Sequence, residues 1–149
     1  MLGPGKPLAL LAFCCSARER EHSRDALATL LWSDSDPTRA RQNLRQALWR
    51  VRRATGDLVS VRDDAVVGVA STIATDRERF LAALHRGEIR AALDAYEGPF
   101  LSGLSFPGGD EFDEWASLER RHLEDQLVRA AEPFLQSCLL YTSPSPRDS

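Results

Sequence analysis

The residues with the clearest capacity for chemistry lie between Arg39 and Arg53, where six arginines occur without one acidic residue. Arginine forms paired hydrogen bonds with phosphate and with guanine, and glutamine pairs with adenine. Gln42, Gln46 and Trp49 stand among these arginines. The segment therefore predicts a surface that binds phosphates and reads the edges of bases.

This segment also has the periodicity of an amphipathic helix. Apolar residues recur at i, i+4, i+7, i+8 and i+11 and predict one buried stripe, made of Ala40, Leu44, Ala47, Leu48 and Val51. The predicted DNA-binding residues are Arg39, Arg41, Gln42, Arg45, Gln46, Trp49, Arg50, Arg52 and Arg53, with Arg62 from a later segment. A merely solvated face is the alternative, but such a face normally mixes charges of both signs for pairing.

Position along the helix suggests two roles within this set. The base-reading positions are expected among Gln42, Arg45, Gln46 and Trp49, which project from the middle of the exposed face. Arg50, Arg52 and Arg53 follow and are expected to hold phosphates. For Trp49, stacking on a sugar, contact with a thymine methyl and packing against a partner all remain open.

Other residues with reactive side chains stand alone. His22, His85 and His122 lack the spacing of metal ligands. Cys14 and Cys15 lie in an apolar helical segment, where thiols are usually inert packing groups. No set of nucleophile, base and orienting residue can be assembled. The sequence therefore predicts no enzyme, no metal site and no cofactor.

The charge of the chain is divided between its halves. The 149 residues carry a net charge of −3, but residues 1–62 carry +5 and residues 63–149 carry −8. Such a split indicates that the basic half meets a polyanion. The longest apolar run, residues 8–15, is too short to span a membrane and has no signal-peptide arrangement, so a cytoplasmic location without membrane contact is expected.

The elements that position the basic face can be placed from capping signals. A helix is expected over residues 6–15, followed by a loop or frayed helix end at 16–22. Ser23 is a candidate N-cap for a second helix through Trp32. Asp36 and Pro37 open the basic helix, which runs to about Ala54 with Gly56 as its stop.

Two short β-rich runs, residues 58–61 and 65–69, flank Arg62-Asp63-Asp64 and predict a hairpin with Arg62 near its tip. Three helices and a hairpin, with the third helix basic, are typical of a winged helix-turn-helix. Residues 76–86, 89–96 and 110–130 then predict helices that resemble helical repeats. The expected fold is mainly α with a small β-hairpin wing: a winged helix-turn-helix followed by a TPR-like α-helical domain.

Two blocks of sequence carry a resemblance to a known family. Residues 31–56, LWSDSDPTRARQNLRQALWRVRRATG, are similar to the recognition region of SARP-type bacterial transcriptional activators. Residues 95–104, AYEGPFLSGL, and 111–124, EFDEWASLERRHLE, resemble the bacterial transcriptional activator domain of that family. These proteins join an OmpR-like winged helix to that helical domain, bind promoter DNA and recruit RNA polymerase.

The resemblance covers roughly residues 5–135 and predicts three segments. Residues 1–70 form the winged helix-turn-helix, without the short β-sheet that usually precedes its first helix in the family. Residues 71–136 form the helical activator domain, in truncated form. Residues 137–149 look like a translated sequencing adapter and are expected to be non-native, the alternative being a natural Ser/Pro tail.

The predicted function is a sequence-specific DNA-binding transcriptional regulator that activates by recruiting RNA polymerase. The resemblance implies double-stranded promoter DNA and RNA polymerase as partners, and it allows a homodimer on direct repeats. Asp34, in the turn before the basic helix, has no evident local role and is the candidate polymerase contact, with a solvated turn acid as the alternative. The competing function is a protein-protein interaction module whose winged helix does not bind DNA.

Overall fold

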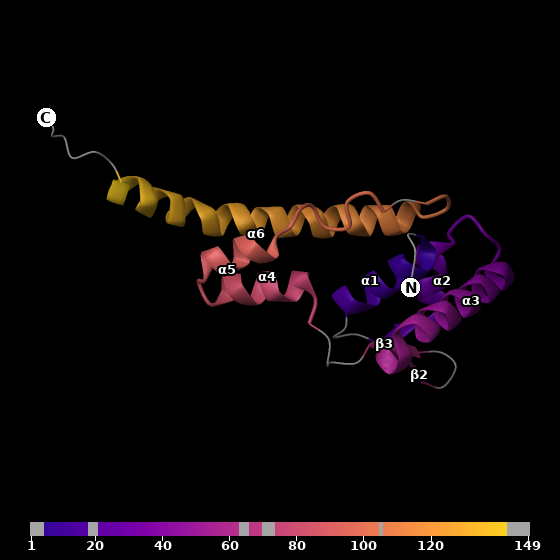
Figure 1. Ribbon diagram of the computed structural model, residues 1–149. Helices are drawn as coiled ribbons and strands as arrows, with labels where there is room; N and C mark the ends of the chain where they lie inside the picture. Colours follow the sequence, from indigo (N-terminus) through magenta and orange to yellow (C-terminus); the bar gives the residue numbers. More distant parts are fainter. Residues whose placement is uncertain (1–4, 18–20, 63–65, 70–73, 105, 143–149) are drawn as a thin grey trace, which may run out of the picture. The chain divides into compact units, whose positions relative to one another are not determined.

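A computed structural model of the chain describes residues 5–17, 21–62, 66–69, 74–104 and 106–142 (Figure 1). The described chain is mainly helical, as predicted, with one small antiparallel sheet. In chain order the elements are α1 (Lys6–Ser16), β1 (His22–Ser23), α2 (Arg24–Leu31), α3 (Pro37–Thr55), a 3-10 turn (Gly56–Leu58), β2 (Val59–Arg62), β3 (Val66–Val69), α4 (Asp76–His85), α5 (Ile89–Ala95) and α6 (Asp110–Thr142). None of the described helices is both long and apolar enough to cross a membrane.

The chain divides into two compact units, which differ from the predicted division at residue 70. Unit 1 comprises residues 1–75 and 101–118, and unit 2 comprises residues 76–100 and 119–149. Residues 101–118 therefore group with the first unit, although the sequence assigns them to the second domain. The reason is packing, because Phe112 and Ala116 of α6 are buried in the same core as α1, α2 and α3.

The core of unit 1 forms where the apolar faces of four helices meet. Leu10 of α1, Leu31 of α2, Val51 of α3 and Phe112 of α6 are each at most 1% exposed. An edge-to-face contact joins the rings of Phe13 and Trp115, with 4.8 Å between their centroids. Aromatic pairs of this geometry add to the gain from burial alone. In this core α3 packs against α1 and α2, and its other face is exposed to solvent.

A three-stranded antiparallel sheet completes unit 1, with strand order β1-β3-β2. The two β-rich runs pair as β2 and β3, with Val61 opposite Val67. The short strand β1 was not predicted, since residues 16–22 were expected to be a loop or a helix end. Two residues are too few to show the period of a strand, so only the pairing of His22 with Val67 reveals it.

Unit 2 has a smaller core. Phe80 and Ala83 of α4, Ala92 of α5 and Leu123 of α6 are its buried residues. At its edge, Arg77 and Glu119 form a half-buried ion pair with 3.0 Å between Nη2 and Oε2. The predicted tail, residues 137–149, overlaps this unit because α6 continues through Thr142.

Candidate nucleic-acid interface

Helix α3 has one buried face and one exposed face, as predicted. The five residues of the predicted stripe, Ala40, Leu44, Ala47, Leu48 and Val51, are all buried. The helix begins where the Asp36 carboxylate accepts a hydrogen bond from the Arg39 amide, at 3.0 Å. It ends at Gly56, whose positive φ of 70° favours glycine. Both ends are therefore encoded locally.

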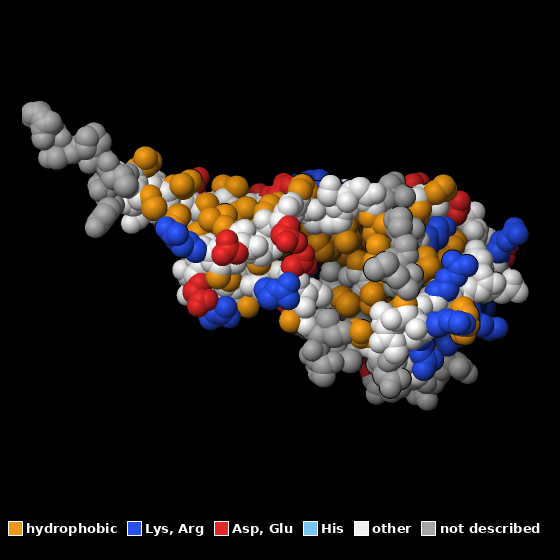
Figure 2. Space-filling view, viewed as in Figure 1, with side chains coloured by type: hydrophobic (Ala, Val, Ile, Leu, Met, Phe, Trp, Pro, Cys, Tyr) orange, Lys and Arg blue, Asp and Glu red, His pale blue; other side chains and the backbone are white. Residues whose placement is uncertain are grey.

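The nine predicted DNA-binding residues of α3 are all exposed: Arg39, Arg41, Gln42, Arg45, Gln46, Trp49, Arg50, Arg52 and Arg53. In the space-filling view the basic side chains gather over α3 (Figure 2). Trp49 is 59% exposed at the centre of this face, and the Arg53 guanidinium lies 5.1 Å from the centre of its ring. A cation over an aromatic face is attracted by the ring quadrupole. This contact restricts both side chains before any ligand arrives.

One acidic residue reaches this face from a different helix. Asp25 of α2 accepts a hydrogen bond from Arg41 Nε at 3.0 Å, and both side chains are mostly exposed. The absence of acids within residues 39–53 therefore does not leave every arginine unpaired. Exposed ion pairs of this kind contribute little stability and open readily to other anions. Arg41 can therefore still bind a phosphate, but its ion pair with Asp25 must then break.

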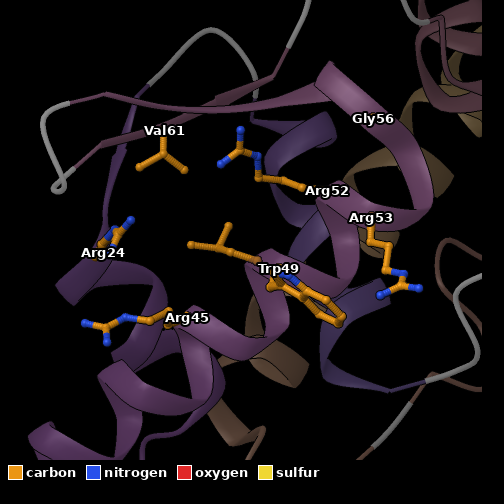
Figure 3. Close-up of a pocket in the computed structure, with 8 residues that line it drawn as sticks. Arg24, Arg45, Trp49, Arg52, Arg53, Gly56 and Val61 are labelled. Atoms are coloured by element: carbon orange, nitrogen blue, oxygen red, sulfur yellow. The ribbon is translucent and has the colours of Figure 1, made fainter.

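A pocket of about 430 Å³ lies beside the exposed face. Four arginines line it, Arg24, Arg45, Arg52 and Arg53, together with apolar side chains that include Leu48 and Val61. Figure 3 shows Arg24, Arg45 and Arg52 on one side of Trp49 and Arg53 on the other. The residues that line the pocket thus include side chains from α3, from the start of α2 and from strand β2.

Arg24 is the residue that sequence reasoning missed. It is the first residue of α2 and follows Ser23, whose hydroxyl accepts a hydrogen bond from the Ala26 amide. Its sequence position, fifteen residues before Arg39, separates it from the basic run. The pattern of one amphipathic helix does not include Arg24. The sequence feature that could have indicated it is its position at a predicted helix start in the basic half of the chain.

A second, mainly apolar pocket of about 380 Å³ lies on the same face and is lined by Arg45, Gln46, Trp49 and Arg50. It brings together three of the predicted base-reading residues. Arg50, expected to hold a phosphate, lies with them, whereas Arg52 and Arg53 line the first pocket. Gln42 lines neither of these two pockets. An apolar surface rimmed by guanidinium and amide groups suits a base edge that carries a methyl group.

Two predicted site residues stand apart from this face. The backbone of Arg62 ends β2, but its side chain lies outside the described residues, as does the hairpin tip at residues 63–65. Asp34 is exposed in the turn between α2 and α3. The sequence indicates no local role for Asp34; in the structure its carboxylate lies against Gly108 and close to Lys6.

The surroundings of Asp34 connect the turn to the segment before α6. Burial lowers the pKa of the Lys6 ammonium, and the negative charge of Asp34 opposes that shift. Ser33 Oγ donates a hydrogen bond to the carbonyl of Gly108 at 3.3 Å. Gly108 has a φ of 78°, and a Cβ there would collide with the Asp34 carboxylate. The Asp34 carboxylate therefore has two neighbours within unit 1, Gly108 and Lys6.

The remaining reactive groups among the described residues are the buried thiols and the side chains that could bind a metal ion. Burial, with the neighbouring Cys15, raises the pKa of the Cys14 thiol to about 12, so the nucleophilic thiolate is scarce near neutral pH. Among the described residues, no three His, Cys, Asp or Glu side chains are grouped so as to hold a metal ion. No family model matches the chain, and no curated protein matches it.

Proposed function

We propose that the chain is a sequence-specific DNA-binding transcriptional regulator that works in the cytoplasm. In this proposal α2, the turn at residues 33–36 and α3 form a helix-turn-helix, and β2 and β3 form its wing. The observation that carries the proposal is the exposed face of α3, where six arginines surround two glutamines and Trp49. Few of these charges are compensated, since among the described residues only Arg41 of the six forms an ion pair.

The shape of unit 1 supports the same reading. An α-helix fits the major groove of B-DNA, and its exposed side chains then meet base edges at the centre and phosphates at the margins. Helix α3 is 19 residues long and buries one stripe, and the nine predicted DNA-binding residues on its opposite face are exposed. The antiparallel pair β2 and β3 follows α3 directly, in the place where a wing would lie over the DNA backbone.

Unit 2 supports an activating role less directly. Its helices α4 and α5 pack as a pair against α6 around Phe80 and Leu123, which suits a TPR-like module that presents a surface to another protein. Together with the resemblance to SARP-type activators, this supports RNA polymerase as the protein partner. The same resemblance supports a homodimer on direct repeats of promoter DNA.

The salt dependence of DNA binding tests the proposal. If about five arginines neutralise phosphates, the logarithm of the binding constant should fall against the logarithm of salt concentration with a slope of about −4 to −5. The measurement is fluorescence anisotropy of the full chain with a labelled duplex between about 50 and 200 mM salt. Arg90→Ala on α5 is the matched control, because it removes an exposed arginine remote from α3 in sequence and should leave the slope unchanged. A slope near zero would contradict the proposal.

One observation favours a second function. Asp25 already pairs with Arg41, which shows that an acidic group can approach this face. A protein-interaction module whose winged helix meets an acidic protein surface would use the same arginines. This second function predicts weak binding to duplex DNA, with the same affinity for all sequences. A sequence-specific regulator should instead select one sequence from a random pool.

A further inference from the structure

The pocket beside α3 contains a guanidinium group with an unmet hydrogen-bond donor. Arg24 Nε is buried and has no hydrogen-bond partner among the described residues. A buried donor without a partner costs free energy, because it has lost its water and gained nothing in exchange. The Arg24 guanidinium can therefore donate a hydrogen bond to an anionic ligand bound in this pocket.

The charges around Arg24 point to the same kind of ligand. Arg45 and Arg52 of α3 line the pocket with Arg24, and none of the described residues that line it is acidic. Their guanidinium groups lie on the same side of Trp49 (Figure 3). Like charges gathered in a half-enclosed space repel one another, and a bound anion would relieve that repulsion. Guanidinium groups donate hydrogen bonds and accept none, so the matching ligand is rich in acceptor oxygens.

We propose that this pocket clamps one backbone phosphate of bound duplex DNA, with Arg24 of α2 and Arg45 and Arg52 of α3 as its ligands. The inference rests on the proposed function and adds Arg24 to the DNA-contacting residues. Leu48 and Val61 line the same pocket and provide an apolar surface for the adjoining deoxyribose. The clamp would fix the register of α3 in the groove and carry no sequence information itself.

A DNA phosphodiester fits this pocket better than a free phosphate ion. The lining is mixed, with guanidinium groups beside the side chains of Leu48 and Val61. A free ion would use only the charged groups, whereas a phosphodiester carries a sugar that can lie against the apolar ones. The three arginine ligands come from two helices, so α2 and α3 must both contact the same DNA strand. A continuous phosphodiester backbone allows this.

The test replaces single phosphates in a duplex by neutral methylphosphonates. The duplex carries the sequence that the full chain selects from a random pool, and affinities are measured for the wild type and for Arg24→Ala. For the wild type, one methylphosphonate position should weaken binding about ten-fold, as expected for a charge-assisted hydrogen bond. In Arg24→Ala the same position should have a clearly smaller effect, because one of the three ligands of the phosphate has been lost. The salt slope of this variant should be smaller in magnitude by about one.

Two controls separate this inference from the proposed function. Arg90→Ala should bind every duplex like the wild type, and Arg24→Ala should unfold at the same or a higher temperature, since it removes repulsion from the pocket. If the wild type binds DNA with the expected salt slope but Arg24→Ala responds to every methylphosphonate as the wild type does, the clamp is wrong and the proposed function stands. If the wild type shows no salt-dependent DNA binding, both fail. Saturable binding of inorganic phosphate to the wild type, with no sensitive methylphosphonate position, would also overturn the clamp.

Discussion

Unit 1 and unit 2 differ in how they combine core and surface charge. Unit 1 buries residues from α1, α2, α3, β2 and α6 in one cluster, and it carries the basic face of α3. Among the described residues, unit 2 buries four in its core and carries the ion pair of Arg77 and Glu119. The comparison teaches that the basic face of α3 stands on a core completed by a segment distant in sequence, because residues 101–118 contribute Phe112 and Ala116 to it.

The largest expected effects come from two matched phenylalanines, one in each core. Phe112→Ala and Phe80→Ala each remove a side chain at most 2% exposed, and each should destabilise its own unit by about 3–5 kcal/mol. Phe112→Ala should also abolish DNA binding, since its unit contains α3, whereas Phe80→Ala should leave DNA affinity near that of the wild type. Thermal unfolding followed by circular dichroism, with anisotropy titrations, measures both effects. Equal loss of DNA affinity in the two variants would break the division into units.

The next effect separates base reading from phosphate binding within unit 1. Gln46→Ala should cost about 1–3 kcal/mol at one base position and relax selection there. Arg53→Ala should instead weaken binding to all sequences about equally. Selection of binding sites from a random pool, followed by affinity measurements on the winners, distinguishes the two variants. The reverse pattern would show that the two roles are assigned to the wrong residues.

A smaller effect is expected at the start of α3. Asp36→Ala removes the side chain that accepts a hydrogen bond from the Arg39 amide. The loss of such an N-cap should lower the free energy of unfolding by about 0.5–2 kcal/mol. Chemical denaturation measures this change, and Asp36→Asn, which keeps a capping oxygen, is the control. An unchanged midpoint for Asp36→Ala would mean that packing alone sets the start of the helix.

The smallest effect on stability is expected at Asp34, the candidate polymerase contact. Asp34→Ala removes a favourable interaction with Lys6, but the side chain is exposed, so stability should fall by less than about 1 kcal/mol. DNA affinity should stay constant or rise slightly, because a negative charge near the phosphates is lost. Transcription in a reconstituted assay should decrease at matched promoter occupancy. Wild-type transcription by this variant would assign Asp34 to the contact with Gly108 alone.

The sequence by itself determines the local features of the basic helix. The apolar stripe through Leu44 and Val51, the cap at Asp36 and the stop at Gly56 were all predictable. Each depends on residues within a few turns of one another, and the period of 3.6 residues converts their spacing directly into faces. The exposure of Trp49 follows from the same geometry.

Only the tertiary structure decides which distant segments join that helix. It brings Arg24 beside Arg45, pairs Asp25 with Arg41 and places Asp34 against Gly108. It also assigns Phe112 to the core of unit 1 and pairs the two-residue strand β1 with β3. Contacts of this kind join residues far apart in sequence, and no periodic spacing of residues along the chain marks them. They are selected by how apolar faces and charges fit in three dimensions, and no local pattern in the chain records that fit.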